Sequence, residues 1–254
     1  MKIISISIPG FGLSEGPPVS PHNLTQFAHD VAAVVDKEGV ENFHLIGYGA
    51  GGIQAVAATF GNIRRVQNFL LLAPLTPASI TGVDAEAAPE TLMMKRIWAL
   101  PLIGKAFACA VAKLMSAQTR FDLFHMLNQN FALDLLRLQN EGNQINVHGQ
   151  QLDLVEFLYE DQYHSLSHSW HAISPDLVVN ELPFALTDVR VQGSVGVIFS
   201  LDDTVHPPAM SRWYCDRIPA CKLIKYDTGY GHRFPLAKSN IERTLQFIKH
   251  GKEF

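Results

Sequence analysis

HLIGYGAGG, residues 44–52, joins a short apolar stretch at Phe43–Gly47 to a run of small residues that extends from Gly52 to about Thr59. An apolar stretch of this length is typical of a buried strand, and the small residues favour a closely packed helix. The glycines between them allow a sharp backbone turn where a Cβ would clash with neighbouring elements. The segment therefore predicts a strand, a tight turn and a helix in succession.

Other segments extend this alternation in both directions. Residues Lys2–Ile8 alternate serine with isoleucine, which favours a strand. Apolar residues recur at helical spacing across Leu24–Glu38, and Gly39 follows as a residue that commonly ends helices. Val66–Ala73 is rich in apolar residues, as central parallel strands are. Strands that alternate with helices predict an α/β fold with a mostly parallel, doubly wound sheet.

The pattern changes between residues 79 and 182, where we expect helices and no strand. The expected helices are Thr91–Met115, Phe121–Asn140, Asp153–Tyr159 and His168–Asn180. Such an insertion indicates a cap over a site, although ordinary helical packing would give the same pattern. The sheet pattern then resumes with a strand at Ser194–Ser200, a helix at Pro208–Cys215, a strand at Cys221–Tyr226 and a final helix at Ser239–His250. We therefore expect one domain, residues 1–254, with a helical cap at about 79–182.

Composition excludes several classes of protein. Of the 254 residues, 47% are hydrophobic and 17% charged, which favours a compact domain over a disordered chain. The net charge of −4 and the lack of a basic run argue against a nucleic-acid or anionic-membrane partner. No apolar run is long enough for a membrane span, and the N-terminus lacks the features of a signal peptide. We therefore expect a soluble, cytoplasmic protein.

The three cysteines, Cys109, Cys215 and Cys221, have no regular spacing. An odd number without a pattern is weak evidence for a disulfide framework or a zinc site. We therefore expect buried or idle thiols in a reducing compartment.

The turn in residues 47–51 has the shape of a nucleophile elbow, Gly-x-Ser-x-Gly, between its strand and its helix. The central residue of an elbow presents its side chain at the carboxyl edge of the sheet, but here that residue is Gly49. Glycine-rich turns also bind phosphates. That alternative is weaker, because the third glycine comes too early for Gly-x-Gly-x-x-Gly and no acidic partner for a ribose is well placed.

Two further residues follow later strands. Asp203 comes shortly after the strand that ends at Ser200, and we prefer it to Asp202 as a catalytic acid because of its spacing from the strand and from Pro207. His232 lies in the loop after the next strand, within Gly231-His232. The order elbow, acid, histidine is that of the catalytic residues on this kind of sheet.

Together these motifs resemble those of the α/β-hydrolase superfamily over nearly the whole chain. Pro9-Gly10-Phe11-Gly12-Leu13-Ser14 is similar to the loop that follows the fourth strand in that superfamily. The resemblance implies a helical cap, a pocket lined by Gly10, Phe11 and Tyr48, and an oxyanion donor at the amide of Ala50. A glycine at position 49 also resembles the N-myc downstream-regulated family, whose members are regarded as non-enzymatic.

The start of the chain departs from the superfamily pattern. Three strands, one helix and a His-Gly loop normally precede the fourth strand, and that loop supplies the second oxyanion donor. We therefore expect half of the oxyanion hole to be missing, unless the start codon has been assigned too far downstream. The strand at Lys2–Ile8 would then either pair with Phe43–Tyr48 or leave an open edge, which predicts a rearranged sheet or a homodimer through that edge.

Three functions are compatible with these residues. Without a side chain at position 49 no acyl-enzyme can form there, and the hydroxyls of Ser14 and Tyr48 are not presented by an elbow. Asp203 and His232 would instead act as a residual dyad on a small apolar carbonyl or ester compound bound under the cap. The alternatives are a non-catalytic ligand-binding or interaction protein, and a serine esterase inactivated by serine-to-glycine replacement at position 49. None of them requires a cofactor or a metal.

Two sets of cap residues have weaker interpretations. His164, His168 and His171 lie close together, but no acidic or cysteine ligand completes a metal site, so we expect surface or pocket-lining histidines. Core packing is a more frequent reason for an apolar stripe than a substrate tunnel. The stripe consists of Leu92, Met93, Met94, Ile97, Trp98 and Leu100.

Overall fold

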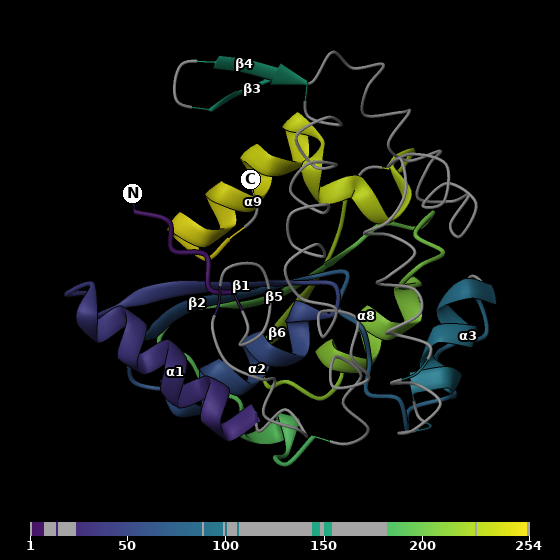
Figure 1. Cartoon of the computed structure of the whole chain (residues 1–254), viewed down its shortest axis with the longest axis horizontal. Helices are drawn as coiled ribbons and strands as arrows, with labels where there is room; N and C mark the ends of the chain where they lie inside the picture. Colours follow the sequence, from purple (N-terminus) through teal and green to yellow (C-terminus); the bar gives the residue numbers. More distant parts are fainter. Residues whose placement is uncertain are drawn as a thin grey trace.

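The computed structural model describes residues 2–7, 14, 24–87, 89–98, 100, 106, 144–147, 150–153, 182–226 and 228–252. Its central sheet has four parallel strands in the order β1-β2-β5-β6 (Figure 1). They are β1 (Phe43–Tyr48), β2 (Val66–Leu72), β5 (Val195–Phe199) and β6 (Cys221–Lys225). Each was predicted to within about two residues, and the α/β class is confirmed.

Helices cover both faces of this sheet. On one face lie α1 (Leu24–Lys37), α2 (Gly51–Gly61) and α8 (Pro208–Cys215), and on the other lies α9 (Lys238–His250) (Figure 1). The remaining described helical elements are α3 (Pro89–Trp98), η3 (Leu186–Asp188) and η4 (Gly231–Leu236). No helix in the described ranges is long and apolar enough to cross a membrane.

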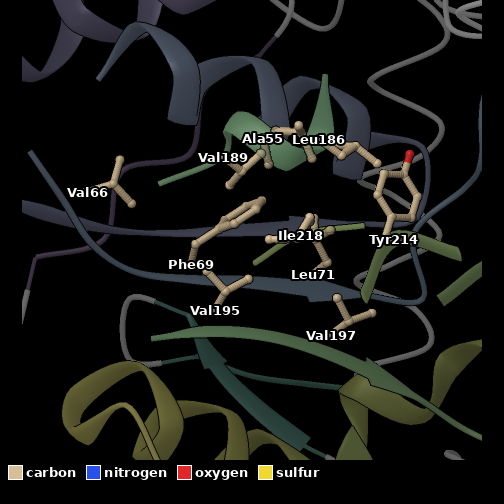
Figure 2. Packing of buried hydrophobic residues seen from close by; sticks show 11 residues of the cluster. Ala55, Val66, Phe69, Leu71, Leu186, Val189, Val195, Val197, Tyr214 and Ile218 are labelled. Carbon is tan, nitrogen blue, oxygen red and sulfur yellow. The ribbon is translucent and has the colours of Figure 1, made fainter. Parts of the chain in front are cut away.

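The larger part of the core lies between the sheet and the helices α2 and α8. Figure 2 shows Phe69 and Leu71 of β2 among the side chains that meet there. Tyr214 of α8 is fully buried in this cluster, and its hydroxyl donates to the carbonyl of Leu75 at 2.7 Å. On the opposite face Phe247 of α9 packs in a second cluster. Both layers hold the carboxyl ends of the strands in fixed positions.

Two glycines allow α2 to approach the sheet closely. A Cβ on Gly47 would lie 2.6 Å from the Cβ of Ala55, and a Cβ on Gly52 would lie 2.9 Å from the Cβ of Pro74. Both distances are shorter than van der Waals contact, so the predicted clash is confirmed at these two glycines. At Gly51 the prediction was wrong, because a Cβ there would have nothing within 4 Å.

The strand predicted at Lys2–Ile8 was wrong for the residues that the structure describes. Residues 2–7 form no strand, and Ile3 is 79% exposed. Alternation of serine and isoleucine favours extended backbone, but a strand also needs a hydrogen-bonded neighbour, and none of the pairings of β1 involves this segment. The homodimer through this edge stays a prediction.

The prediction that residues 79–182 contain no strand was also wrong. β3 (Gln144–Val147) and β4 (Gln150–Asp153) form an antiparallel pair, so Asp153 ends a strand and does not begin a helix. Val147 pairs with Gln150, and the two residues between them include a glycine, a spacing that favours a hairpin. Of the predicted cap helices only the first is represented, by α3, and apart from Asp153 the others lie outside the described residues.

The expectation of idle thiols fails for two of the three cysteines. Cys215 at the end of α8 and Cys221 at the start of β6 form a disulfide, with Cα atoms 5.2 Å apart. A short helix-to-strand turn brings them together, although a spacing of six residues matches no common motif. Disulfides are characteristic of oxidising compartments. The pair therefore gives no support to a reducing compartment, and the cytoplasmic location stays a prediction.

Candidate active site

The carboxyl ends of the four parallel strands meet along one edge of the sheet. Gly49 follows β1, Ala73 follows β2, Asp203 follows β5 and His232 follows β6. Residues in these positions converge because parallel strands all end on the same side. The structure thereby brings Gly49, Asp203 and His232 together.

Gly49 adopts the backbone conformation of an elbow. Its φ is +57°, which strains any residue with a Cβ, and its amide donates to the carbonyl of Leu72 at 3.0 Å. A Cβ built on Gly49 would lie 3.6 Å from Nε2 of His232 and 3.5 Å from Cε1 of His206. A side chain here would therefore point at both imidazoles without a clash.

Asp203 orients His232. Its Oδ2 lies 2.9 Å from Nδ1 of His232, and both side chains are buried. Its Oδ1 accepts hydrogen bonds from the amides of Val205 and His206, at 3.0 and 2.9 Å. A carboxylate on Nδ1 favours the tautomer with the proton on that nitrogen, so Nε2 faces position 49 as an acceptor.

Asp202 has a different task. Its Oδ2 accepts from the amides of Gly229 and Gly231, which precede His232, and its Oδ1 accepts from Ser200. Burial raises the pKa of Asp202, but the hydrogen bonds from Ser200 and the two amides outweigh it and lower that pKa below its usual value. This charged carboxylate therefore anchors the histidine loop.

Tyr48 lies against His232. The two rings stack with centroids 5.0 Å apart and an interplanar angle of 21°, and the tyrosine hydroxyl donates to the carbonyl of His232 at 2.9 Å. These contacts make Tyr48 a wall beside the histidine. Ser14, the other hydroxyl considered from sequence, donates to the carbonyl of Ser7 at 3.3 Å. Gly10 and Phe11 lie outside the described residues.

Sequence reasoning missed His206. Its Nδ1 lies 2.7 Å from the carbonyl of Ala73, and its ring meets that of His232 edge to face, with centroids 4.4 Å apart. Burial lowers the pKa of His206 to about 3, and His232 beside it acts in the same direction. His206 is therefore neutral at physiological pH. The available signal was its place next to Pro207, three residues after Asp203.

The partner of His206 is itself strained. Ala73 has a φ of +42°, which is unfavourable for a residue with a Cβ, and it is fully buried at the end of β2. Backbone strain of this kind collects at functional sites. Here it accompanies a carbonyl that fixes the proton of His206 on Nδ1.

Ala50 occupies the N-cap position of α2. Its amide donates to none of the described residues, and the partial positive charge at a helix N-terminus favours an anion there. It can therefore act as the oxyanion donor that the resemblance implied.

The first helix of the predicted cap region, α3, is anchored by a buried ion pair. Lys95 of α3 contacts Asp84 at 2.8 Å and also donates to Thr76 and to the carbonyl of Ile80. In the apolar stripe of this region, Leu92 packs against a core cluster whereas Met93 and Leu100 are exposed. The side chains of Met94, Ile97 and Trp98, and all of His164, His168 and His171, lie outside the described residues.

One cavity in the described chain, of about 520 Å³, lies where the insertion leaves and rejoins the sheet. Its lining includes Pro77, Ile80, Leu182, Phe184, Trp213 and Arg217, but none of Gly49, Asp203 and His232. Among the described residues no group of three or more histidine, cysteine and acidic side chains could hold a metal.

A sequence profile of the alpha/beta hydrolase family matches residues 2–244, nearly the whole chain. The chain belongs to the alpha/beta hydrolase family. Among curated proteins, none matches this alpha/beta hydrolase in sequence.

Three solved structures illustrate the likeness in fold. The enol-lactonase from Burkholderia xenovorans LB400 is 15% identical, with a TM-score of 0.56 over 96% of this chain and 79% of its own. MenH from S. aureus is 20% identical, with a TM-score of 0.57 over 96% and 82%. The esterase from Exiguobacterium antarcticum is 16% identical, with a TM-score of 0.56 over 95% and 79%. At these identities the likeness shows the fold of an alpha/beta hydrolase and nothing finer.

Proposed function

We propose that this alpha/beta hydrolase cleaves a small apolar ester, or a related carbonyl compound, with a water molecule above Gly49 as the nucleophile. The observation that carries the proposal is the position of Nε2 of His232. It lies 3.6 Å from the place of a Cβ on Gly49, while Asp203 holds the opposite ring nitrogen. Apart from Gly49 and its two chain neighbours, the nearest described atom to that place is 3.5 Å away, so a water oxygen has room beyond the Cα of Gly49, on the side of the two imidazoles. Family membership, and the lactonase and esterase among the similar structures, support a substrate of this class.

His232 is the general base of the proposed reaction. Because Asp203 keeps a proton on Nδ1, Nε2 takes the proton of the water as its oxygen attacks the carbonyl carbon. The imidazolium then returns this proton to the leaving alkoxide, so the products are a carboxylic acid and an alcohol. Asp203 stabilises the imidazolium while it exists. A positioned base of this kind contributes roughly 10²–10⁴-fold to the rate.

The amide of Ala50 is the proposed donor to the oxyanion of the tetrahedral intermediate. It lies one residue beyond Gly49, at the start of α2. Losing one of two oxyanion donors costs about 3–4 kcal/mol of transition-state stabilisation. We therefore expect turnover to be slow if Ala50 acts alone.

Hydrolysis of p-nitrophenyl acetate and butyrate by three matched proteins tests the proposal. The parent should release p-nitrophenol above background, and His232→Ala should lower that rate by roughly 10²-fold or more. His29→Ala removes an exposed histidine of α1 and should match the parent. Equal rates for the parent and His232→Ala would refute the proposal. Recovery of an unaltered, tightly bound apolar ligand from the inactive parent would favour a binding protein.

A further inference from the structure

The hydrogen bond from Asp203 fixes one nitrogen of His232 but leaves the plane of its ring undetermined. Nδ1 lies 2.9 Å from the carboxylate, and Nε2 lies 3.6 Å from the place of a Cβ on Gly49. The torsion about the Cβ–Cγ bond of a histidine is broad, so a ring bonded at one nitrogen can still rotate. A misplacement of about 1 Å can cost on the order of 100-fold in rate. A general base at this position therefore benefits from contacts that fix its plane.

Two other rings contact the imidazole of His232 at different angles. The ring of Tyr48 stacks on it, with centroids 5.0 Å apart and an interplanar angle of 21°. The ring of His206 meets it edge to face, with centroids 4.4 Å apart and an angle of 74°. Both are preferred geometries for aromatic pairs. A rotation of the imidazole of His232 about its Cβ–Cγ bond would therefore disturb both contacts at once.

We propose that Tyr48 and His206 are positioning residues, which together form an aromatic clamp that holds Nε2 of His232 toward position 49. The inference rests on the proposed function, and it gives each of the two side chains a role in that reaction. Neither of them touches the reacting atoms in this role. They act on the rate through the orientation of His232.

Both rings of the aromatic clamp are themselves held by hydrogen bonds. The hydroxyl of Tyr48 donates to the carbonyl of His232 at 2.9 Å, so this ring is tied to the backbone of the residue on which it stacks. Nδ1 of His206 lies 2.7 Å from the carbonyl of Ala73, and the amide of His206 donates to Asp203 at 2.9 Å. The clamp therefore has fixed sides against which the imidazole can rest.

The charge state of His206 is compatible with this role. Burial lowers the pKa of His206 to about 3, so its ring stays neutral at physiological pH. A second imidazolium next to His232 would oppose proton transfer to that histidine. His206 can therefore pack against the base without repelling the charge that forms on it.

Paired substitutions at positions 48 and 206 test the clamp. Leucine and phenylalanine both remove the side-chain hydrogen bond of the parent residue, but only phenylalanine keeps an aromatic ring. With p-nitrophenyl acetate, Tyr48→Leu and His206→Leu should each lower kcat roughly tenfold with KM little changed, and Tyr48→Phe and His206→Phe should recover most of that loss. The double leucine variant should lose little more than either single variant, because a ring released on one side is already displaced. Equal losses for leucine and phenylalanine, or losses that multiply in the double variant, would overturn the inference.

High-resolution crystal structures give a readout that does not depend on turnover. The parent should show one orientation of the His232 ring in contact with both aromatic neighbours, and each leucine variant should show a rotated ring or several orientations. A parent structure with this ring rotated away from Tyr48 and His206 would overturn the inference, even if a leucine variant does not fold. An unchanged single orientation in both leucine variants would also overturn it. If the ring responds as expected but His232→Ala leaves the rate unchanged, only the proposed function fails.

Discussion

Asp202 and Asp203 are adjacent in the chain, yet they bind different parts of the His232 loop, one its backbone and the other the imidazole. Asp203 contacts the imidazole at 2.9 Å, whereas Asp202 binds the backbone amides of Gly229 and Gly231. One carboxylate therefore orients the ring and the other orders the loop that carries it.

Exchanging each aspartate for asparagine should separate these tasks. Asp203→Asn should lower kcat on the order of 10³-fold, because the ring loses both its preferred tautomer and its counter-charge. Asp202→Asn should lower kcat only about tenfold, with a fall in melting temperature, because it weakens hydrogen bonds to backbone amides. Steady-state kinetics and thermal unfolding of both variants provide the measurement. A larger loss of kcat for Asp202→Asn would reverse the assignment.

Substitutions at Gly49 should distinguish water from a side-chain nucleophile. Gly49→Ala puts a methyl carbon 3.5 Å from Cε1 of His206 and 3.6 Å from Nε2 of His232, where it narrows the space for the proposed water and should abolish hydrolysis. Gly49→Ser places an Oγ within reach of His232 and should give a burst of p-nitrophenol and an acyl-enzyme visible by mass spectrometry. Each variant should lose about 1–2 kcal/mol of stability because φ is positive.

The outcomes at position 49 also separate the competing functions. Rapid turnover by Gly49→Ser with an inactive parent would identify an inactivated serine esterase. Unchanged hydrolysis by Gly49→Ala would show that the water lies elsewhere.

Gly47 and Gly51 should respond in opposite ways to alanine. A Cβ on Gly47 would lie 2.6 Å from Ala55, and we expect Gly47→Ala to cost about 1–3 kcal/mol or more. A Cβ on Gly51 would have nothing within 4 Å, and alanine favours helix, so Gly51→Ala should keep or raise the free energy of unfolding. Urea denaturation compares the two. Similar losses at both positions would show that α2 does not pack on the sheet as described.

His206 should make stability depend on pH. The pKa of His206 is about 3 in the folded chain, below its ordinary value of 6.5. Below pH 6.5, therefore, the unfolded chain binds a proton at this histidine and the folded chain does not. The free energy of unfolding keeps its full value with respect to this histidine above pH 6.5, and it decreases as the pH falls toward 3. Between pH 7 and pH 5 the free energy of unfolding should fall about 2 kcal/mol more in the parent than in His206→Phe. Parallel pH dependence in the two proteins would contradict the burial of a neutral His206.

The disulfide should contribute measurably to stability. A loop of this length predicts about 2 kcal/mol from the restriction of the unfolded chain. Reduction with dithiothreitol should therefore lower the melting temperature of the parent and leave the Cys215→Ala/Cys221→Ala variant unchanged. An unaffected parent would mean that the pair is not formed in solution.

The strands and helices of the sheet were predictable because their signals are local. Apolar periodicity located α1, and the glycines at positions 47 and 52 predicted the close approach of α2. The first strand failed for the opposite reason. Residues 2–7 carry strand propensity, but a strand depends on a neighbour that propensity does not supply.

The site was only partly predictable. Asp203 and His232 could be chosen because each follows a strand at a recognisable spacing, and the structure places them 2.9 Å apart. His206 was not predicted as a site residue, because its position depends on a contact with the carbonyl of Ala73, which is 133 residues away in sequence. The disulfide was not predicted, because the turn between α8 and β6 brings the sulfurs together and the cysteine spacing alone does not indicate this.

The site is divided among four separate loops, one at the end of each strand. Gly49, Ala73, the Asp203–His206 segment and His232 each belong to a different loop, while the side chains that hold the strands together lie beneath them. Chemistry on this scaffold can therefore be changed one loop at a time, by mutation or by design, with little penalty in folding. Gly49 occupies one of these loops, and a substitution there leaves the other three in place.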